Sequence, residues 1–581
     1  MKKFTPSKQM KWLFIGVLVL IGVCVLLTIL IIRHATSKNT LREPWLESTE
    51  DGEAVNPNRE ITLENVYITA VDEHTITFLY QGNRYTLPCK TDSDVTGIAN
   101  ILIKNQKIQK ITLKNDYISG MLISYTEDQV EVEGYGVISC EPNVNVYEDY
   151  EDEIRAISMN NLVVGASNLK YYVADDCICA VVQSEKTQVY DIRVLIKNGI
   201  QPTYSSLYLT ADTTFWIEDT AFSAHEPVNV KQYLVDNQKA LIKITCENGG
   251  RLYITDENGN ITSSGYEGLF YVRAYDTEKT RVALINEIEI EDYVRYVLPS
   301  EMPDSFSYEA LKTQAVCART FAYSQMTDPT YAAYGANLDD TTSFQVYNEI
   351  GTKEITDRAV ADTTGEVITC DGELITCYYY STNPGVSEDM EVWEKEQLPY
   401  IHKYSTLLSG KTVEELGLEQ EENLVAFLNG AEEAYDSCSP FYRWTAQLDL
   451  SNVCDEKLGK LKYMLISKRS TSGYILRLTL VYEGGTKMLS DENDIRAFFA
   501  PYMTSLQLSN GTERTNFPLL PSDCFYIASV TEDLHYVLKG GGYGHAIGMS
   551  QYGANAMGQA GYTYEDIIHF FYTNVEITLY K

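Results

Sequence analysis

The sequence is poor in the residues that build common metal and hydrolase motifs. It has only 7 histidines among 581 residues. The HxxxH, HExxH and CxxC spacings that are typical of zinc sites are absent from the sequence. It also lacks the GxSxG turn that carries the nucleophile of α/β-hydrolases. Neither a metal-dependent nor a serine-hydrolase activity has a motif here, and we expect no metal and no cofactor.

Positive charge is scarce as well. The 46 Lys and Arg residues face 81 Asp and Glu residues, a net charge of -35, which argues against nucleic acid as a partner. Proline is infrequent at 16 residues, whereas 44% of the chain is apolar and 44 residues are tyrosine, so disorder is excluded and strands are favoured. The length predicts three or four domains at about one per 150 residues.

Only one long apolar run exists, the 21 uncharged residues Trp12–Ile32, which as a helix match the thickness of a bilayer. Four lysines and no acid precede it in residues 1–11, so the positive-inside rule predicts a cytoplasmic tail and an extracytoplasmic bulk. We therefore expect a single-pass protein of the cell membrane. The alternative is a cleaved signal peptide, but this run exceeds the usual length and ends in Arg33-His34.

Cysteine spacing does not indicate a disulfide framework. Of 12 cysteines, Cys24 lies in the apolar run, which leaves an odd number outside it. Asp371-Gly372 predicts a hairpin turn that sets Thr369 opposite Leu374 and Glu366 opposite Cys377, so Cys370 and Cys377 do not face each other. Unpaired exported thiols would suit a reducing habitat, a hypothesis that thiol counting tests.

The patterns of apolar, charged and turn-forming residues along the chain predict an α+β protein with several parts. An acidic linker at 33–58 leads to a β-rich region at 59–188, and an α+β domain with a helical insertion at about 410–436 follows at 189–581. Residues 61–68 (ITLENVYI) recur as 111–118 (ITLKNDYI). This similarity marks either two tandem β modules or a chance resemblance between hairpins.

The first stretch that suggests chemistry surrounds Glu301. Pro299 and Pro303 bracket this carboxyl, so we expect a rigid loop there and a long helix at about 307–326. Lys312 and Arg319 are seven residues apart and share a face of that helix. They either hold a polar substrate or are ordinary surface charges, for instance in an ion pair with Glu309.

The second stretch is a glycine-rich loop near the C-terminus. Five glycines at 540, 541, 542, 544 and 548 permit close backbone approach to a ligand, and His545 lies among them. No βαβ unit surrounds the loop, which argues against a phosphate site. From the sequence alone, His545 is as plausibly functional as structural.

These residues occur in ordered blocks, and from about Ile192 to Lys581 the chain resembles the SpoIID family, which comprises stage II sporulation protein D and its relatives, including LytB-type amidase enhancers. The matching blocks are Ile192–Leu195, Glu291–Tyr293, Ser300–Pro303, Leu311–Val316, Ala318–Thr320, Gln345–Tyr347, Tyr380–Ser381, Val392–Trp393, Ser439–Pro440, Arg443–Trp444 and Gly544–Ala554. The resemblance implies an α+β catalytic domain and a membrane-anchored lytic transglycosylase that cleaves peptidoglycan glycan strands, with a preference for strands without stem peptides.

By this resemblance Glu301 is the catalytic acid. One carboxyl suffices in such an enzyme because the 6-hydroxyl of N-acetylmuramic acid (MurNAc) replaces the attacking water and gives a 1,6-anhydro end. Glu301 would need a pKa raised towards neutrality by Met302, Pro303 and nearby tyrosines. Our candidates for binding the sugar are Lys312, Arg319, Tyr380, Ser381, His545 and Gln551. Gln314, which turns away from the first two, is a weaker candidate.

The sequence also departs from the family pattern. A metal-binding Cys-Asp-Thr-Thr-His-Cys run of many relatives reads Asp339 to Phe344 here, so we expect no zinc. The usual Ser-Gly-Gly is Asn383-Pro384-Gly385, and the second glycine of Gly-His-Gly is Ala546. These changes keep an alternative open, a non-catalytic module that binds glycan or activates a cell-wall amidase or other envelope protein. A structural component that depends on the β-rich region is a third reading.

Overall fold

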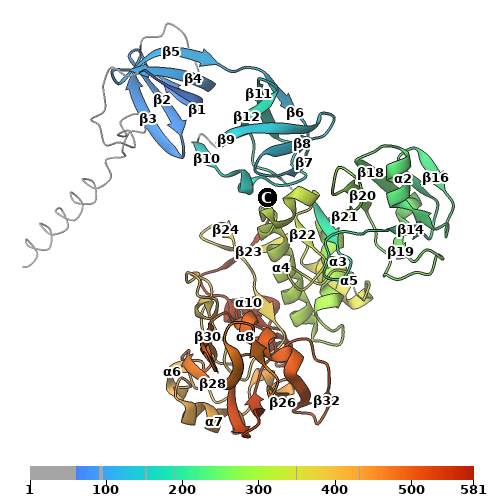
Figure 1. The fold of residues 1–581 in the computed structure, drawn as a ribbon, viewed down its shortest axis with the longest axis vertical. Coiled ribbons are helices and arrows are strands. Elements are labelled where there is room, and N and C mark those ends of the chain that lie inside the picture. Colours follow the sequence, from blue (N-terminus) through green and yellow to red (C-terminus); the bar gives the residue numbers. More distant parts are fainter. Residues whose placement is uncertain are drawn as a thin grey trace, which may run out of the picture. The chain divides into compact units, whose positions relative to one another are not determined.

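The computed structural model describes residues 60–89, 96–150, 153–188, 190–348, 350–430 and 432–580. The predicted tail 1–11, the apolar run Trp12–Ile32 and the linker 33–58 lie outside the described residues. Within the described ranges, no helix is both long and apolar enough to cross a membrane. These ranges mix helices with a high content of strands, which confirms the mixed, strand-rich class that the sequence predicts (Figure 1).

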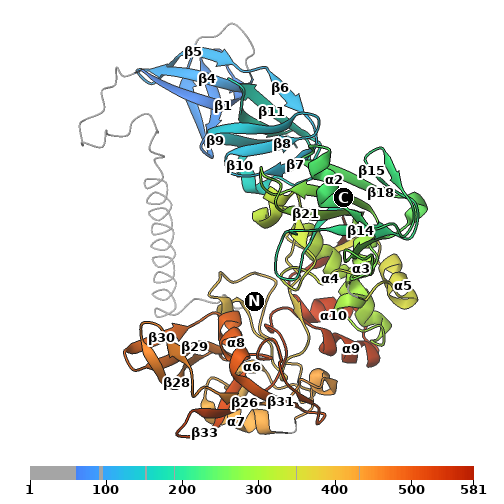
Figure 2. The ribbon, with the colours of Figure 1, turned by 45° about the vertical axis from the view of Figure 1, so that its right-hand side comes forward.

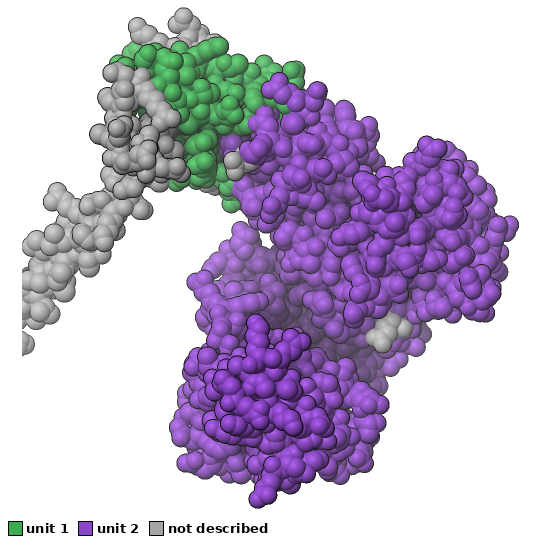
Figure 3. Space-filling view, viewed as in Figure 1, with its two compact units in different colours: residues 1–117, 151–156, 172–174 green, residues 118–150, 157–171, 175–581 purple. Residues whose placement is uncertain are grey.

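The chain divides into two compact units (Figure 3). The first comprises Met1–Tyr117, Glu151–Ala156 and Tyr172–Ala174, and the rest of the chain forms the second. In the first unit, five antiparallel strands form a sheet in the order β3-β2-β1-β4-β5. Its strands are β1 (Ile61–Val71), β2 (Thr75–Tyr80), β3 (Asn83–Pro88), β4 (Gly97–Lys104) and β5 (Lys107–Leu113), and β10 (Glu153–Ile157) falls largely in this unit.

Local sequence explains the hairpins of this first sheet. Gln81 and Gly82 between β2 and β3 both have positive φ, at 47° and 75°, and Asn105 and Gln106 between β4 and β5 have 53° and 56°. Two consecutive left-handed residues make the turn whose twist matches the flanking strands. The predicted β hairpins are therefore confirmed in this region.

A second sheet, most of whose residues belong to the second unit, has the strand order β6-β11-β12-β9-β8-β7 and a parallel pair between β12 and β9. Its strands are β6 (Tyr117–Ser119), β7 (Leu122–Tyr125), β8 (Gln129–Val132), β9 (Gly136–Tyr150), β11 (Leu169–Ala174) and β12 (Cys177–Gln183). The repeated octapeptide does not mark equivalent elements. Residues 61–68 lie inside β1, whereas 111–118 run from the end of β5 into β6, so the similarity is a chance one.

A third sheet follows in the order β16-β15-β18-β20-β21-β13-β22, beside a small sheet β17-β14-β19. The strands are β13 (Asp191–Ile196), β14 (Tyr208–Ala211), β15 (Phe215–Ile217), β16 (Thr220–Phe222), β17 (Val228–Asn229), β18 (Leu241–Cys246), β19 (Leu252–Thr255), β20 (Leu269–Ala274), β21 (Val282–Glu289) and β22 (Leu338–Asp339). Helix α2 (Val230–Asp236) belongs to this part. Strand β21 leads directly into the helices that carry the site.

Helices α3 (Ile290–Glu301), α4 (Tyr308–Ser324), α5 (Glu354–Asp362), α9 (Gln551–Gln559) and α10 (Tyr564–Phe571) form the helical core (Figure 2). Helix α4 confirms the predicted long helix, and the Ser307 side chain caps it by accepting from the Ala310 N–H. Helix α10 begins with a capping box formed by Thr563 and Asp566. Ser307 also bonds Asn555 of α9 at 2.8 Å, which joins segments 248 residues apart.

The remaining strands form four further sheets. A three-stranded sheet contains β23 (Glu366–Cys370), β24 (Glu373–Leu374) and β36 (Glu576–Leu579). A two-stranded sheet pairs β25 (Tyr379–Tyr380) with β35 (Met549–Ser550). A five-stranded sheet contains β26 (Trp444–Asp449), β31 (Met503–Leu508), β32 (Glu513–Arg514), β33 (Phe525–Val530) and β34 (His535–Gly540), and a four-stranded one β27 (Cys454–Asp455), β28 (Gly459–Arg469), β29 (Ile475–Tyr482) and β30 (Gly485–Leu489).

The helical insertion predicted at about 410–436 contains α6 (Val413–Leu416) and α7 (Glu421–Asn429). These helices are not simply exposed, because each buries one face, with Val413 in α6 and Leu424 and Phe427 in α7. A third short helix, α8 (Glu492–Phe499), follows β30 and is capped by Asp491. It becomes important for the site.

The predicted hairpin at Asp371-Gly372 is confirmed in its register, since Thr369 pairs with Leu374. The pairing of Glu366 with Cys377 is wrong, because β24 ends at Leu374 and Glu366 pairs with Leu579 of β36 instead. Cys370 and Cys377 are both free thiols, as are all cysteines in the described ranges.

Candidate active site

Glu301 is the last residue of α3, so the prediction that it lies in a loop is wrong. Pro299 lies inside the final turn, where its missing N–H costs a single helical hydrogen bond. The Ser300 hydroxyl donates to the Tyr296 carbonyl at 2.8 Å, and the Met302 N–H closes the helix on the Leu298 carbonyl at 2.9 Å. The carboxyl is therefore carried by a rigid helix end.

Glu301 has polar surroundings. The Val346 N–H donates to its Oε1 at 2.6 Å. Gln345 bridges two phenols, accepting from Tyr293 at 3.1 Å and donating to Tyr379 at 3.1 Å. Burial, and then the charge of Glu301, raise the pKa of both phenols well above the ordinary range. Both tyrosines therefore stay protonated beside the carboxyl.

A pocket of about 490 Å³ opens beside Glu301. It brings together five of the predicted site residues, namely Glu301, Tyr380, Ser381, His545 and Gln551. Aromatic side chains dominate the rest of its wall: Phe321, Phe344, Tyr378, Tyr379, Trp393 and Tyr543. Flat aromatic faces with a few polar groups between them are suited to bind sugar rings.

His545 faces this pocket within a group of aromatic rings. Its imidazole lies 5.1 Å from the Trp393 ring and 5.7 Å from the Tyr380 ring, measured between centroids. Burial, together with the charge of Arg496, lowers the pKa of His545 to about 3. Because Nδ1 accepts from the Ile547 N–H at 3.1 Å, the neutral ring carries its proton on Nε2. His545 is thus a neutral polar group.

Two further site residues, Tyr380 and Ser381, make hydrogen bonds within the protein. The Tyr380 hydroxyl is 2.7 Å from the Tyr404 hydroxyl and accepts from Asn383 Nδ2 at 2.8 Å. The Ser381 carbonyl accepts from the Tyr552 N–H at 3.0 Å. These bonds fix the orientation of Tyr380 and the backbone of Ser381 in the pocket wall.

Gln551 links the two sequence blocks that the prediction singled out. Its Nε2 donates to the main-chain carbonyl of Glu301 at 3.1 Å and to Gln314 Oε1 at 3.3 Å. Gln314, the weaker candidate, is buried and therefore belongs to this network. Helix α9 begins at Gln551 and so fixes the end of α3.

Lys312 and Arg319 do not line the pocket. Lys312 pairs with Glu309 at 2.7 Å and lies 4.6 Å from the centre of the Tyr564 ring. Arg319 is fully buried and binds Glu291 with two hydrogen bonds of 2.8 and 2.7 Å. Both residues hold helices together, and the geometry favours the ion-pair reading over substrate binding.

Comparison with known proteins fits this arrangement. Residues 278–370, which include Glu301, match the stage II sporulation protein (SpoIID) family, and residues 387–548 match a domain of unknown function, DUF8618. The chain is 28% identical over 309 residues to the stage II sporulation protein D of Bacillus subtilis (strain 168), an alignment covering 51% of this chain and 76% of that protein. The chain contains a SpoIID family domain.

A second relative of the SpoIID domain is named amidase enhancer, also from Bacillus subtilis (strain 168). It is 29% identical over 300 residues, covering 49% of this chain. The aligned part spans 40% of the amidase enhancer's own length. A stage II sporulation protein D of Bacillus amyloliquefaciens is 28% identical to this chain over 309 residues. The alignment covers 75% of that protein.

The run at 339–344 of the SpoIID domain does not fit a metal. Phe344, at one expected thiol position, offers no ligand atom and lines the pocket. Asp339, at the other, accepts from Lys197 Nζ at 3.1 Å and from the Tyr331 hydroxyl at 2.7 Å. Burial raises the pKa of Asp340 to about 6, and its Oδ1 accepts from the Lys197 N–H at 3.1 Å. Both carboxylates are therefore already bound by hydrogen bonds or an ion pair within the protein.

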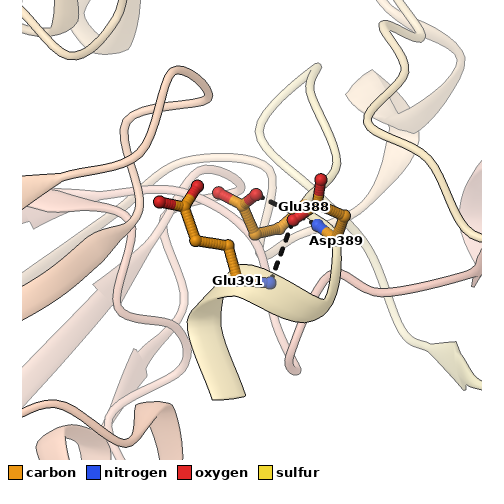
Figure 4. A group of neighbouring side chains, drawn as sticks. All are labelled: Glu388, Asp389 and Glu391. Carbon is orange, nitrogen blue, oxygen red and sulfur yellow. Dashed lines mark hydrogen bonds between the residues drawn. The ribbon is translucent and has the colours of Figure 1, made fainter. Parts of the chain in front are cut away.

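A second acidic cluster lies near the glycine-rich loop. It consists of Glu388, Asp389 and Glu391 (Figure 4). The Lys403 ammonium binds Glu388 at 2.7 Å and Glu391 at 3.0 Å. This ammonium supplies the positive charge that a cation would otherwise provide. We therefore read the group as an ion-pair network that holds the loop.

The fold accommodates the two loop segments that depart from the family pattern, residues 383–385 and Ala546. Asn383 Oδ1 accepts from the Gly385 N–H at 2.7 Å, and Gly385 has a φ of 115° that only glycine adopts readily. Ala546 has a φ of 63°, a left-handed conformation that strains an alanine backbone. The replaced segments form a bonded turn and a strained but ordered loop.

Gly548→Ala should destabilise the protein by about 2–3 kcal/mol, as measured by urea denaturation. A Cβ at this position would meet the Tyr378 carbonyl oxygen at 2.0 Å. That oxygen cannot retreat easily, since it accepts from the Tyr572 hydroxyl at 2.7 Å and the Met549 N–H at 3.0 Å. Ala546→Gly is the matched control and should shift stability by less than about 1 kcal/mol. Equal stability of the two variants would contradict this account of the loop.

Sequence reasoning missed part of the pocket wall. Trp393 stood in a matching block but was given no role, although it packs on His545. Glu492, Arg496 and Leu519 had no signal, because they lie nearly 200 residues from Glu301 and only folding brings them to the pocket.

Proposed function

We propose that this protein is a lytic transglycosylase that cleaves the bond between MurNAc and N-acetylglucosamine (GlcNAc) in denuded peptidoglycan strands. Glu301 acts first as general acid and then as general base. Tyr380, Ser381, His545 and Gln551 contact the sugars. The aromatic side chains in the pocket wall favour a ring-shaped ligand such as a sugar.

In this reaction the Glu301 carboxyl donates its proton to the glycosidic oxygen, and the bond from that oxygen to C1 of MurNAc breaks. The departing GlcNAc keeps the proton as a hydroxyl. The 6-hydroxyl of MurNAc then bonds to C1 while its proton passes to the Glu301 carboxylate. Glu301 returns to its starting state, and no water is consumed.

One observation carries this proposal. Of the two carboxyl groups in the pocket lining, Glu492 is bound to Arg496 at 2.5 Å, so Glu301 is the group suited to proton transfer. Hydrolytic glycosidases place two working carboxyl groups about 5–9.5 Å apart. A pocket with one such group supports a mechanism in which the substrate provides the nucleophile.

The proposal is tested by incubating the full-length protein with denuded glycan strands and analysing the products by mass spectrometry. We expect fragments ending in 1,6-anhydro-MurNAc. Products with ordinary reducing ends, or intact strands under conditions where the protein is folded, would contradict it.

A second candidate function is a non-catalytic glycan-binding module or an activator of a cell-wall amidase. The internal bonding of the Tyr380 hydroxyl and the replacement of glycine by Ala546 favour it, and one relative is named amidase enhancer. Stimulation of a purified cell-wall amidase by the Glu301→Gln variant, without cleavage by the wild type, would support this alternative.

We also propose that the protein is held at the extracytoplasmic face of the cell membrane by Trp12–Ile32. This proposal rests on the length and flanking charge of the apolar run. Protease protection of the N-terminal tail in sealed protoplasts, with digestion of the remaining chain, is the expected result.

Lys312→Met should change kcat/KM for glycan by less than about twofold, because Lys312 pairs with Glu309 outside the pocket. Product formation measured alongside the folded fraction provides the check. A loss of tenfold or more in a folded variant would restore Lys312 to the binding site.

A further inference from the structure

One part of the pocket wall comes from the segment that matches a domain of unknown function, residues 387–548. Helix α8 of this segment places Glu492 and Arg496 in the lining, one helical turn apart, with Leu519 next to them. The relative exposures of the Glu492 and Arg496 side chains are only 3% and 9%. A nearly buried ion pair that reaches a pocket is unusual enough to need an explanation.

The pair is firmly oriented. Arg496 Nη1 donates to Glu492 Oε1 at 2.5 Å, and Arg496 Nε donates to the Leu520 carbonyl at 2.8 Å. Within the described ranges, Arg496 Nη2 and Glu492 Oε2 make no hydrogen bond to another side chain. The pair thus retains a donor on one residue and an acceptor on the other.

The charges around the pair decide which ligand it suits. Glu492 and Arg496 cancel each other. Burial, and then the charge of Glu492, raise the pKa of the neighbouring Asp523 well above its ordinary range, which favours the neutral form of this carboxyl. His545 is neutral too. A site without net charge has no electrostatic preference for an anion or a cation.

A neutral group that carries both an N–H donor and a carbonyl acceptor matches such a pair. An acetamido group has this pattern, and its methyl group requires an apolar contact, which Leu519 offers in the same wall. A sugar hydroxyl could use the donor and acceptor but would leave the apolar contact unused.

We propose that Glu492 and Arg496 form a subsite for the acetamido group of an amino sugar, in which the ligand N–H donates to Glu492 and the ligand carbonyl accepts from Arg496. This assigns a specificity role to the segment of unknown function. It rests on the proposed function in that it shares the glycan pocket, but it concerns binding and requires no cleavage.

The test compares two neutral tetrasaccharides, chitotetraose, which has acetamido groups, and cellotetraose, which has hydroxyls in their place. Affinities are measured by calorimetry with the full-length Glu301→Gln protein, with and without Arg496→Gln. We expect chitotetraose to bind at least tenfold more tightly than cellotetraose, and Arg496→Gln to bring the ratio to within about twofold of one.

The ratio separates recognition from a structural effect, because a loosened pocket would weaken both ligands alike. Glu492→Gln, which keeps an oxygen for Arg496, is the second variant and should also lower the ratio by at least threefold. A ratio that both variants leave unchanged, or a parent protein that does not prefer chitotetraose, would overturn the inference. If the ratio depends on the pair but the wild type releases no anhydro ends, the proposed reaction fails and the subsite stands.

Discussion

Glu301→Gln should lower the rate of anhydro-end formation at least about 10³-fold. Glutamine keeps the oxygen that accepts from the Val346 N–H at 2.6 Å, so the helix end and the pocket remain in place. An amide can neither release a proton to the glycosidic oxygen nor take one from the 6-hydroxyl. Binding of glycan should therefore stay within about threefold of the wild type, while turnover is lost. Single-turnover cleavage and calorimetry measure the two quantities separately.

Glu309→Gln is the matched control for this variant. Glu309 lies on α4, pairs with Lys312 at 2.7 Å and is not part of the pocket lining. It should keep at least half of the wild-type rate. A Glu301→Gln variant that retains a tenth or more of the activity would show that another group supplies the proton.

Asp523→Asn should make the protein more stable than the wild type at neutral pH. Asp523 is fully buried, and within the described part of the chain neither carboxyl oxygen has a hydrogen-bond partner. Burial, and then the charge of Glu492, raise its pKa well above the ordinary range, whereas Arg496 opposes this shift. The folded protein keeps a proton that the unfolded chain releases above about pH 4. Asparagine is neutral in both states and has no such cost.

The direction of the pH dependence follows from proton counting. Between about pH 4 and the folded pKa, the native state binds more protons than the unfolded state, so stability falls as pH rises. The slope is about 1.4 kcal/mol per pH unit, and below pH 4 the penalty is absent. The advantage of Asp523→Asn should thus be small at about pH 4 and grow as the pH rises towards the folded pKa.

Urea denaturation of both proteins at several pH values measures this advantage, and a variant of an exposed carboxyl, Asp219→Asn, serves as the control. An advantage that stays constant from pH 4 to pH 7 would mean that Asp523 is ionised in the folded protein.

Local signals in the sequence predicted local structure well. The alternation and turns of 59–188, the helix at about 307–326 and the hairpin at Asp371-Gly372 each depend on neighbouring residues. The prediction for Glu301 failed because a proline in the last turn of a helix costs little, so Pro299 does not end α3. The ends of helices depend on such small energies.

The sequence predicted site residues correctly only where two segments of the family pattern meet in the fold. Glu301 and Gln551 both stood out in the sequence, and the fold joins them at 3.1 Å. Arg319 also stood out, but its role as a buried partner of Glu291 depends on packing between α3 and α4. Glu492 and Arg496 gave no signal, because an i,i+4 ion pair is common on solvent-exposed helices.

The central claim is that the substrate, rather than water, attacks the sugar. The most direct measurement is cleavage of denuded glycan by the full-length protein in water enriched in oxygen-18, followed by mass spectrometry of the new ends. The account predicts ends that lack the heavy isotope and are lighter than hydrolytic ends by one water. Incorporation of one heavy oxygen at each new end would contradict it and identify the protein as a hydrolase.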